Sequence, residues 1–385
     1  ASKILELIML YHLKDFLYTE CNQFGFKAGH GTDLCIFTMK EIIEYYMSRN
    51  SPVYVCYLDA SKAFDRINHW TLFKKLIHRK MNVMYVRLLM YWYSKQTFCI
   101  KWANVYSDFF NVTNGVRQGG ITSPILFNIY MNDLSVKLNE CYYGCRINYT
   151  VINHLLYADD SCLIAPSPFA LQKLLDVCEQ FACENSIKYN EKKTKCMCFK
   201  PMSMQDLFVP DVYLNRKPLT YVGTQKYLGV YINDKLDDND DIRRQVKALY
   251  TRGNILVNNF NKCSQQVKNC LFKSYCSNCY GGQLWSIYKK DVYKKCVVAY
   301  NDIYRKLFNI KRGESISAVY ANNKIDSFNT IIRKDVFRFR NRTIHFKNIL
   351  ISAVLESSFY NTCSNITKKW NNITIFDKSV MYAHD

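Results

Sequence analysis

Two adjacent acidic residues, Asp159 and Asp160, lie between the apolar segments HLLYA and SCLIA near the middle of the chain. Over residues 154–164 these segments have the composition of two short strands that meet at the acids. An unpaired carboxylate that is buried away from water costs several kcal/mol, so two of them together need either a bound cation or a solvated turn. The sequence therefore predicts a hairpin with both acids at its tip.

A third acid, Asp59, stands at the end of another apolar segment. Residues 53–58, VYVCYL, are β-branched and aromatic and predict one buried strand. An isolated acid at a strand end more often caps a turn or a helix than it binds a metal. If both strands belong to one sheet, however, the three carboxylates converge and offer the hard oxygen ligands that Mg²⁺ prefers. Two such ions about 4 Å apart support in-line displacement at phosphorus, the chemistry of nucleotidyl transfer.

The charge of the chain points to the same class of substrate. Among 385 residues, 52 are Lys or Arg and 32 are Asp or Glu, which gives a formal net charge of +20. Such a balance suits a polyanion, with nucleic acid as the leading candidate and an anionic membrane as the alternative. No stretch approaches the ~20 consecutive apolar residues that would cross a bilayer. We therefore expect a nucleic-acid partner and no membrane.

The cysteines and the first residue bear on context. The 17 cysteines are irregularly spaced in a chain too large to depend on disulfides, so we expect reduced, intracellular thiols. The CxxC pair Cys276 and Cys279 has no second pair or His at zinc-site spacing, which favours core packing over metal binding. The chain begins with Ala and opens with no secretory signal, which predicts a fragment of a longer product.

Three helices are predicted in the first half of the chain. Apolar residues at helical spacing run from Asn68 onward, over 123–134 and over 169–186. The second of these helices has Ser123 as its expected N-cap and Pro124 as its first helical residue.

The second half of the chain changes character. A short strand pair is expected around Tyr221 to Ile232, and from the acidic run at 237–241 to about residue 310 the pattern is almost continuously helical. We therefore expect a domain boundary near 235. Over 311–385 the pattern weakens and predicts no role.

Several segments resemble, in order and with ordinary spacing, the successive palm motifs of reverse transcriptases. They are YLDASKAFDRINH (57–69), GVRQGGITSPILFNIYMNDL (115–134), YADD (157–160), IKYNEKKTK (187–195) and KYLGVYI (226–232). The non-LTR, LINE-type retrotransposon branch is resembled in particular by SKAFDRINH, LFNIYMNDL, NQFGFKAGHGT (22–32) and LFKSYCSNCYGGQLW (271–285). The resemblance covers about residues 2–310.

This resemblance implies a fold, an activity and partners. The fold is α+β, the right-hand polymerase fold, with an antiparallel palm sheet and a helical thumb. Fingers and palm would occupy 1–235, the thumb 236–310, and a basic, helical C-terminal extension 311–385. The activity would be that of an RNA-directed DNA polymerase, which extends a DNA primer on an RNA template with deoxynucleoside triphosphates. The implied location is the nucleus and a cytoplasmic ribonucleoprotein. Nothing in the sequence implies an oligomeric state.

The resemblance also assigns a metal site. Asp59 resembles the first metal ligand, with the backbone carbonyl of Ala60 beside it. Asp159 resembles the ligand that bridges both metals, and Asp160 its less directly coordinated neighbour. The implied cofactor is a pair of Mg²⁺ ions, with Mn²⁺ as an alternative.

Four further residues match positions that contact substrates. Phe64 matches the aromatic gate whose ring would clash with a ribose 2′-hydroxyl, and an ordinary core Phe is the alternative. Gln118 and Gly119 match the segment that lies against the nascent base pair, where a glycine permits close approach. Plain loop residues are the alternative for Gln118 and its neighbour Arg117. Lys193 matches the lysine that protonates the leaving pyrophosphate, with Lys195 as a second candidate and a solvated charge run as the alternative.

Two more elements match parts that hold the primer. Tyr227-Leu228-Gly229 resembles the hairpin that grips the primer end, and Asn190 is expected to shape the loop that carries Lys193. The lysines and arginines of the helical region that follows would track phosphates without reading sequence, and a solvated helix face is the alternative.

Two departures from the family pattern leave alternatives open. Residues 118–120 read QGG, which is commoner in group II intron reverse transcriptases than in LINE-type enzymes, and the Arg-Pro-Ile element that supplies a fingers arginine is missing before Ser2. The alternatives are a group II intron-type reverse transcriptase with a maturase role, and a nucleic-acid-binding remnant that no longer polymerises. No endonuclease domain, RNase H domain or zinc knuckle is recognised.

Overall fold

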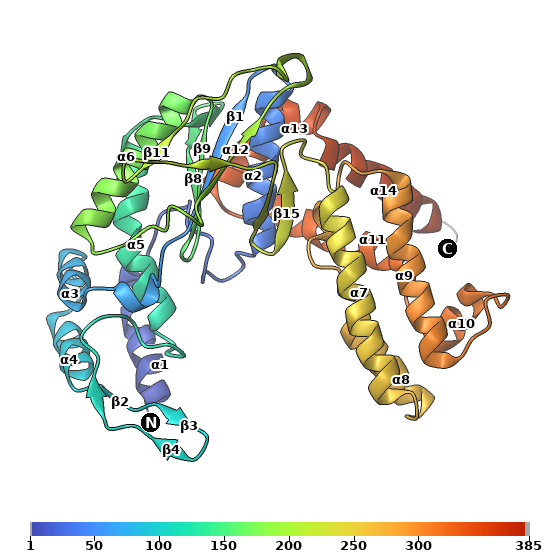
Figure 1. The fold of residues 1–385 in the computed structure, drawn as a ribbon, viewed down its shortest axis with the longest axis horizontal. Coiled ribbons are helices and arrows are strands. Elements are labelled where there is room, and N and C mark those ends of the chain that lie inside the picture. Colours follow the sequence, from blue (N-terminus) through green and yellow to red (C-terminus); the bar gives the residue numbers. More distant parts are fainter. Residues whose placement is uncertain (1, 382–385) are drawn as a thin grey trace. The chain divides into compact units, whose positions relative to one another are not determined.

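The computed structural model describes residues 2–381 and divides into two compact units (Figure 1). One unit comprises the chain through Met39 together with Asn50–Val222, and the other comprises Lys40–Arg49 and the chain from Gly223 onward. The division falls inside helix α2 (Thr32–Met47), whose first half belongs to the first unit and whose second half belongs to the second. Residue 235, where the sequence predicts a boundary, lies inside the second unit.

The first unit is built on a five-stranded sheet with the strand order β13-β10-β1-β9-β8. Its strands are β1 Val53–Leu58, β8 His154–Tyr157, β9 Asp160–Ala165, β10 Lys195–Phe199 and β13 Thr220–Tyr221. All neighbours pair antiparallel except β10 and β13, which are parallel. Strand β1 is the central strand and all six of its residues are buried, as its unbroken apolar sequence predicts.

Five helices and four small ribbons complete the first unit. The helices besides α2 are α1 Ser2–Leu13, α3 His69–His78, α4 Val83–Ser94, α5 Ser123–Glu140 and α6 Pro168–Glu184. The ribbons pair β2 Thr97–Phe98 with β5 Phe110–Asn111, β3 Lys101–Trp102 with β4 Val105–Tyr106, β6 Cys145–Ile147 with β7 Thr150–Ile152, and β11 Tyr213–Leu214 with β12 Lys217–Pro218. All three predicted helices are present.

The start of α5 differs from the prediction. The residue before the helix is Thr122, and Ser123 is the first helical residue, so Ser123 as the N-cap is wrong. Its hydroxyl instead donates to the carbonyl of Arg117 (2.5 Å). The backbone N–H groups of Ile121 and Thr122 are satisfied by the buried carboxylate of Glu6, which is placed there by α1. A carboxylate at this position also complements the positive end of the helix dipole.

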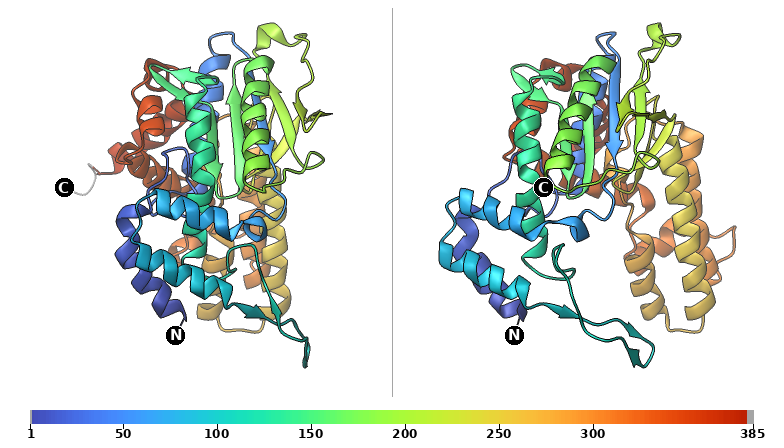
Figure 2. Two further views of the ribbon diagram at one scale, coloured as in Figure 1. Left: turned by 90° about the vertical axis from the view of Figure 1, so that its left-hand side faces the viewer. Right: turned by 60° about the vertical axis from the view of Figure 1, so that its left-hand side comes forward.

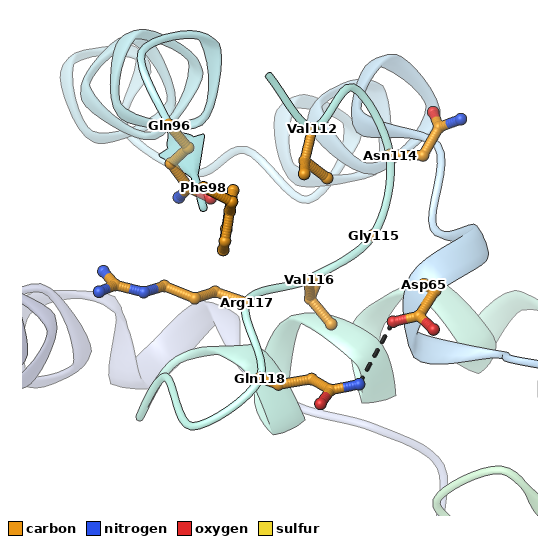
Figure 3. A pocket seen from close by; sticks show the side chains of 9 residues that line it. All are labelled: Asp65, Gln96, Phe98, Val112, Asn114, Gly115, Val116, Arg117 and Gln118. Carbon is orange, nitrogen blue, oxygen red and sulfur yellow. Dashed lines mark hydrogen bonds between the residues drawn. The ribbon is translucent and has the colours of Figure 1, made fainter. Parts of the chain in front are cut away.

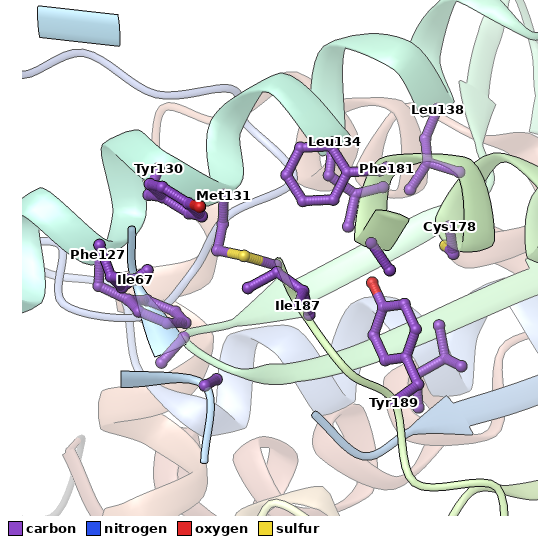
Figure 4. Packing of buried hydrophobic residues seen from close by; sticks show 14 of the residues in the cluster. Ile67, Phe127, Tyr130, Met131, Leu134, Leu138, Cys178, Phe181, Ile187 and Tyr189 are labelled. Carbon is purple, nitrogen blue, oxygen red and sulfur yellow. The ribbon is translucent and has the colours of Figure 1, made fainter. Parts of the chain in front are cut away.

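Helices α5 and α6 pack against one face of the sheet (Figure 4). Large buried side chains of both helices meet there, among them Phe127, Tyr130, Met131, Leu134, Leu138, Cys178 and Phe181. On the opposite face, the hydroxyl of Tyr57 and the thiol of Cys162 both point to the sulfur of Met39 in α2, at 3.5 and 3.8 Å. The sheet is therefore covered on both faces, which explains why its strands read as unbroken apolar runs.

The second unit is mostly helical. It contains α7 Asn239–Phe260, α8 Gln265–Cys276, α9 Lys290–Phe308, α10 Ile316–Asn323, α11 Phe328–Ile344, α12 Ile349–Leu355, α13 Ser358–Thr362, α14 Asn365–Met381 and the ribbon of β14 Thr224–Tyr227 with β15 Val230–Asn233. The expected strand pair and the helical run to about 310 are both present. Helices α7 and α9 lie in close contact at Gly253, where an added Cβ would stand 2.6 Å from Ile303. Residues 316–381 of the weakly patterned C-terminal segment contain five of these helices, and Trp370 among them is buried.

The thiols and the helices bear on two expectations about context. Within residues 2–381 none of the 17 cysteines forms a disulfide bond, and Cys276 and Cys279 are both buried. Within residues 2–381 no helix combines the length and apolarity that crossing a membrane would take.

Candidate active site at the end of the central sheet

The pairing of β1 with β9 brings the three acids to one end of the sheet. Leu58 lies opposite Ser161 in this antiparallel pair, so the next position along places Asp59 beside Asp160. Opposed residues of an antiparallel pair point to the same face, and Tyr57 opposes Cys162, so the alternation puts Asp59 and Asp160 on one face. The hairpin of β8 and β9 closes between Tyr157 and Asp160. Its tip is the two-residue loop that carries the third acid, Asp159.

A segment from the N-terminal part of the chain holds this hairpin. The backbone of residues 22–24 runs beside β8, where Leu156 N donates to Asn22 O (2.9 Å) and Phe24 N donates to Leu156 O (2.7 Å). The side chain of Gln23 then accepts from the N–H groups of Gly25 and Ala158, at 2.8 and 3.0 Å. One buried amide oxygen therefore fixes the residue that immediately precedes Asp159.

The loop itself depends on a close backbone approach. Ala158 has φ 58°, the left-handed conformation that few non-glycine residues adopt. Its backbone lies against Gly25, where an added Cβ would stand 2.3 Å from Ala158 N. Gly25 is therefore required by contact between two backbones.

Asp59 is held through its backbone by the segment before β10. Its N–H donates to Thr194 Oγ1 (3.2 Å) and its carbonyl accepts from Asn190 N (2.9 Å). Ser61 N donates to Lys188 O (2.8 Å). The carbonyl of Ala60 lies between the Asp59–Asn190 and Ser61–Lys188 backbone bonds and takes part in neither of them. The predicted shaping role of Asn190 has a physical basis here, because its side chain also accepts from Lys192 N and Lys193 N.

The three acids repel one another. Burial and then the charge of Asp59 raise the pKa of Asp159, although a hydrogen bond from its own backbone N–H partly offsets them. Partial burial of the carboxyl group, followed by the charges of Asp159 and Asp59, raises the pKa of Asp160 to about 6. Asp160 is exposed, so water screens part of this repulsion. At neutral pH the group is negatively charged at an energetic cost that a bound cation would relieve.

The donor set fits a metal that substrate helps to hold. Within residues 2–381, no three His, Cys, Asp or Glu side chains form a group that could hold a metal ion by themselves. Mg²⁺ is usually bound through one or two carboxylates together with water and substrate phosphates. Two adjacent carboxylates with raised pKa values and a third at the end of the neighbouring strand match that mode of binding.

Phe64 lies in a short 3₁₀ turn, Phe64–Arg66, five residues after Asp59. Its ring stacks on that of Phe127 in α5, with centroids 4.1 Å apart and planes 12° apart. The edge of the ring also meets Phe26 at 6.2 Å. The side chain is half-buried, so one part is fixed by packing and another part remains accessible.

Gln118 borders a pocket of about 380 Å³ (Figure 3). Its amide donates to the carboxylate of Asp65 at 3.4 Å, a long hydrogen bond. Gly115, with φ 90°, lets this segment approach the 3₁₀ turn, because an added Cβ would stand 2.9 Å from Asp65 Cα. The full lining comprises Asp65, Gln96, Phe98, Val112, Asn114, Gly115, Val116, Arg117 and Gln118.

Within residues 2–381, the remaining predicted residues, Gly119, Lys193 and Lys195, form no hydrogen bond with the side chains of the three acids. Gly119 is exposed, has φ 79° and has open space around it. Lys193 is exposed on the loop that Asn190 and Thr194 tie to Asp59, and Lys195 opposes Tyr57 in the sheet. In the described part of the chain, no ion pair joins either lysine to the three acids.

Several residues that build the site are not predicted from the sequence. Each of them contacts a residue more than a hundred positions away in the sequence. The pairs are Glu6 with Ile121, Gln23 and Gly25 with Ala158, and Thr194 with Asp59. Gln23 and Gly25 lie in NQFGF and Thr194 lies in IKYNEKKTK, and the resemblance includes both segments without giving these three residues a role.

Comparison with known proteins identifies the family to which the chain is similar. Residues 1–232 match the family model described as reverse transcriptase (RNA-dependent DNA polymerase). A probable RNA-directed DNA polymerase from transposon X-element of Drosophila melanogaster is 25% identical over 374 residues, which cover 92% of this chain and 40% of that protein. The RNA-directed DNA polymerase from mobile element jockey of the same fly is 25% identical and covers 70% of this chain and 30% of its own length.

Two further proteins are also similar to this chain. A Pol polyprotein from the type-1 retrotransposable element R2 of Nasonia vitripennis is 27% identical over 51% of this chain and 20% of that protein. Apo telomerase from Candida tropicalis is 14% identical, with a TM-score of 0.46 over 100% of this chain and 59% of that one. The chain thus spans less than half the length of the transposon proteins that it matches.

The family match covers more than half of the chain and includes the whole of the sheet that carries the acids. The predicted α+β right-hand polymerase fold and the predicted similarity to non-LTR retrotransposon enzymes are confirmed. The one parallel pair, β10 with β13, is an addition to the antiparallel palm sheet that was predicted. This chain belongs to the reverse transcriptase family.

Proposed function

We propose that this chain is an RNA-directed DNA polymerase that extends a DNA primer on an RNA template. The observation that carries the proposal is the meeting of Asp59, Asp159 and Asp160 at one end of the central sheet, in a chain of the reverse transcriptase family. The family generally uses divalent metal ions. The chain's net charge of +20 also suits a template and a primer.

Asp59 and Asp159, with the carbonyl of Ala60, would hold two Mg²⁺ ions, and Asp160 would lie beside them. When bound, such ions activate a primer 3′-hydroxyl and stabilise the negative charge of departing pyrophosphate. The protein's own part is positional. The fixed Ala158–Asp159 loop and the anchored backbone of Asp59 keep the carboxylates in place before substrate arrives.

The other residues take roles around the nucleotide. Phe64 would exclude a ribose 2′-hydroxyl, and its stack on Phe127 supports this role because it prevents the ring from turning away. Gln118 and Gly119 would lie against the nascent base pair, where the open space around Gly119 permits close approach. Lys193 would donate a proton to the pyrophosphate, and its exposure leaves its ammonium group free to reach a substrate.

We further propose that residues 1–235 act as fingers and palm and 236–310 as the thumb. The β14–β15 hairpin closes at Leu228 and Gly229, both with positive φ, and would grip the primer end. The tip is braced inside the second unit by Tyr280, whose hydroxyl donates to Leu228 O at 2.7 Å.

Primer extension on poly(rA)/oligo(dT) with the Asp159→Ala variant tests the proposal. Incorporation of dTMP should fall by about a hundredfold or more, because a carboxylate needed to hold the metals is lost. Asp206→Ala, which removes an exposed acid from a surface loop, is the matched control and should keep wild-type activity. Equal incorporation by Asp159→Ala and wild type would refute the assignment.

A further inference from the structure

The segment between β2 and β5 exposes large aromatic side chains that nothing in the chemistry above uses. Trp102 is 83% exposed, Tyr106 61% and Phe109 75%. We call residues 97–111 the aromatic ribbon. In both views of Figure 2 the part of it that carries β3 and β4 extends away from the helices of the first unit. Large apolar groups gathered at one exposed place usually mark a binding surface.

The aromatic ribbon is built as an ordered structure. β2 pairs with β5 at its base and β3 with β4 at its tip. Between them, Ser107 N donates to Ile100 O and Ile100 N donates to Ser107 Oγ, both at 2.9 Å. These bonds hold the backbone while the rings stay in water, so the exposed rings are not the product of an unfolded loop.

The two faces of the tip each present a ring. Lys101 opposes Tyr106, and its ammonium nitrogen lies 5.2 Å from the centre of that ring, so both are on one face. Trp102 opposes Val105 and occupies the other face. The ribbon has one basic residue, Lys101, and one acidic residue, Asp108, so attraction to phosphates contributes little here. Binding at this surface must come from stacking.

The base of the ribbon reaches the candidate active site. Phe98 of β2 and the adjacent Gln96 line the same pocket as Arg117 and Gln118 (Figure 3). Phe98 is also paired with Phe110 of β5, which is exposed. A line of aromatic groups therefore leads from the pocket beside Gln118 outward along the ribbon.

We propose that the aromatic ribbon binds the single-stranded part of the template that has not yet been copied, with its bases stacked on Trp102 and Tyr106. The proposal rests on the polymerase function proposed above, since Gln118 is there the contact to the base pair being formed. Unpaired bases offer free ring faces, which a duplex does not, and stacking on aromatic side chains tolerates any sequence. A template must be read regardless of its sequence.

The test compares two primer–templates that share one duplex. In the first, the template ends one nucleotide beyond the primer, and in the second it continues for about ten nucleotides, within the range that such surfaces bind. In the wild type, KM for the long overhang should be lower. In the variant Trp102→Ala/Tyr106→Ala, KM for the long overhang should rise about tenfold. It should extend the short overhang at the wild-type rate, because the carboxylates and Gln118 are untouched.

Two variants serve as controls. Phe208→Ala removes an aromatic ring that is equally exposed, at 82%, but lies outside the ribbon, and it should keep the preference for the long overhang. Trp102→Phe keeps an aromatic ring and should therefore keep most of the wild-type affinity for the long overhang, whereas Trp102→Ala should lose it. Equal loss on both overhangs, or an unchanged preference in the double alanine variant, would overturn the proposal. The second outcome would point instead to a protein partner for the ribbon.

A direct binding measurement separates this inference from the polymerase assignment. Fluorescence anisotropy of a labelled single-stranded oligoribonucleotide should show weaker binding by the double alanine variant than by the wild type, at every salt concentration. If the wild type extends neither primer, the polymerase proposal fails. The difference in binding between the two proteins still tests whether the aromatic ribbon binds single-stranded RNA. Identical anisotropy curves for the two proteins would then refute the ribbon as a binding surface.

Discussion

Phe64 is fixed by its neighbours and yet partly accessible, which is what a steric gate requires. Replacing it with Val removes the ring while leaving a branched apolar side chain against Phe127. We expect the ratio of kcat/KM for a deoxynucleotide over the matching ribonucleotide to fall by about tenfold or more, because the 2′-hydroxyl is no longer excluded. Single-nucleotide incorporation with dTTP and UTP on poly(rA)/oligo(dT) measures this ratio.

The matched variant is Phe64→Tyr, which keeps the ring plane and should keep the discrimination. Loss of the stack on Phe127 should also cost Phe64→Val about 1 kcal/mol of stability, so unfolding is measured alongside. Unchanged sugar selectivity in Phe64→Val would remove this residue as the gate.

His154 is a second residue whose surroundings allow a definite expectation. It is fully buried in β8, and burial lowers its pKa to about 3. Its Nδ1 lies 2.6 Å from Asn153 Oδ1, an acceptor, so Nδ1 carries the proton. Its Nε2, 2.6 Å from Ser135 Oγ, then accepts from that hydroxyl. The neutral ring is fully satisfied, and protonation would break this arrangement.

A pKa lowered on folding means that stability is present above the unfolded-state value of 6.5 and is lost as the pH falls toward 3. His154 should therefore contribute a loss of about 1.4 kcal/mol for each pH unit below 6.5. Urea unfolding of the wild type and His154→Gln between pH 7 and pH 5 checks this, and the variant should lose the slope. His78→Gln, at an exposed position, should keep the wild-type slope, and equal slopes for all three proteins would contradict the expectation.

At this scale the sequence predicts the acids and not the residues that hold them. Asp59, Asp159 and Asp160 are marked by the apolar strands beside them, a local signal. Glu6 and Thr194 act through side-chain hydrogen bonds to positions more than a hundred residues away, and no local pattern encodes such a pairing.

Among the elements, the β8–β9 hairpin depends most on its contact with the segment at 22–25. Gly25→Ala would place a Cβ against the backbone nitrogen of Ala158, which cannot move without shifting Asp159. We expect a loss of about 2–3 kcal/mol in the free energy of unfolding and a marked loss of extension activity. Chemical denaturation and primer extension on the same sample measure both.

Gly313→Ala is the matched control, because no atom lies within 4 Å of an added Cβ there. It should leave stability and activity unchanged. Wild-type stability in Gly25→Ala would show that this backbone approach is not required.

The elements predicted well are those with a strong period or a buried apolar run, such as β1, α3 and α6. The aromatic ribbon and β13 were not predicted, because strands of two residues are too short to show alternation. For 311–385 the sequence predicts a helical extension but not the bounds of the individual helices α10–α14. Their buried residues are interleaved with Arg, Lys and Asn that remain at the surface, so the apolar stripe is weak.

For the molecule as a whole, the second unit is stabilised by a residue from early in the chain. Lys40, in α2, forms a buried ion pair with Asp238 at 2.7 Å and also donates to Leu284 O at 3.0 Å. Asp238 in turn accepts from Ser286 N and Ile287 N. Removing one partner of such a pair leaves an uncompensated charge.

Lys40→Met should therefore lower the free energy of unfolding by about 3–5 kcal/mol. The double variant Lys40→Met/Asp238→Asn should recover part of this loss, because it removes the orphaned charge as well. Urea denaturation followed by circular dichroism measures both proteins. A double variant no more stable than Lys40→Met would argue against charge as the cause.

At this scale the sequence predicts a change from mixed to helical structure, and both halves are observed. It predicts neither α2 nor the sharing of that helix between the units, because a division after Met39 depends on contacts with residues far away in the sequence.

The sharing of α2 between the units limits how the gene can recombine and where the protein can be truncated. The ten residues Lys40–Arg49 are encoded far upstream of the rest of their unit. A single crossover between codons 222 and 223 would combine Asp238 from one parent with Lys40 from the other. A recombinant between diverged copies therefore keeps the ion pair only if the residues at positions 40 and 238 are compatible. A polypeptide produced from codon 223 onward would lack that stretch altogether, and adding it back as a separate peptide should restore its folding.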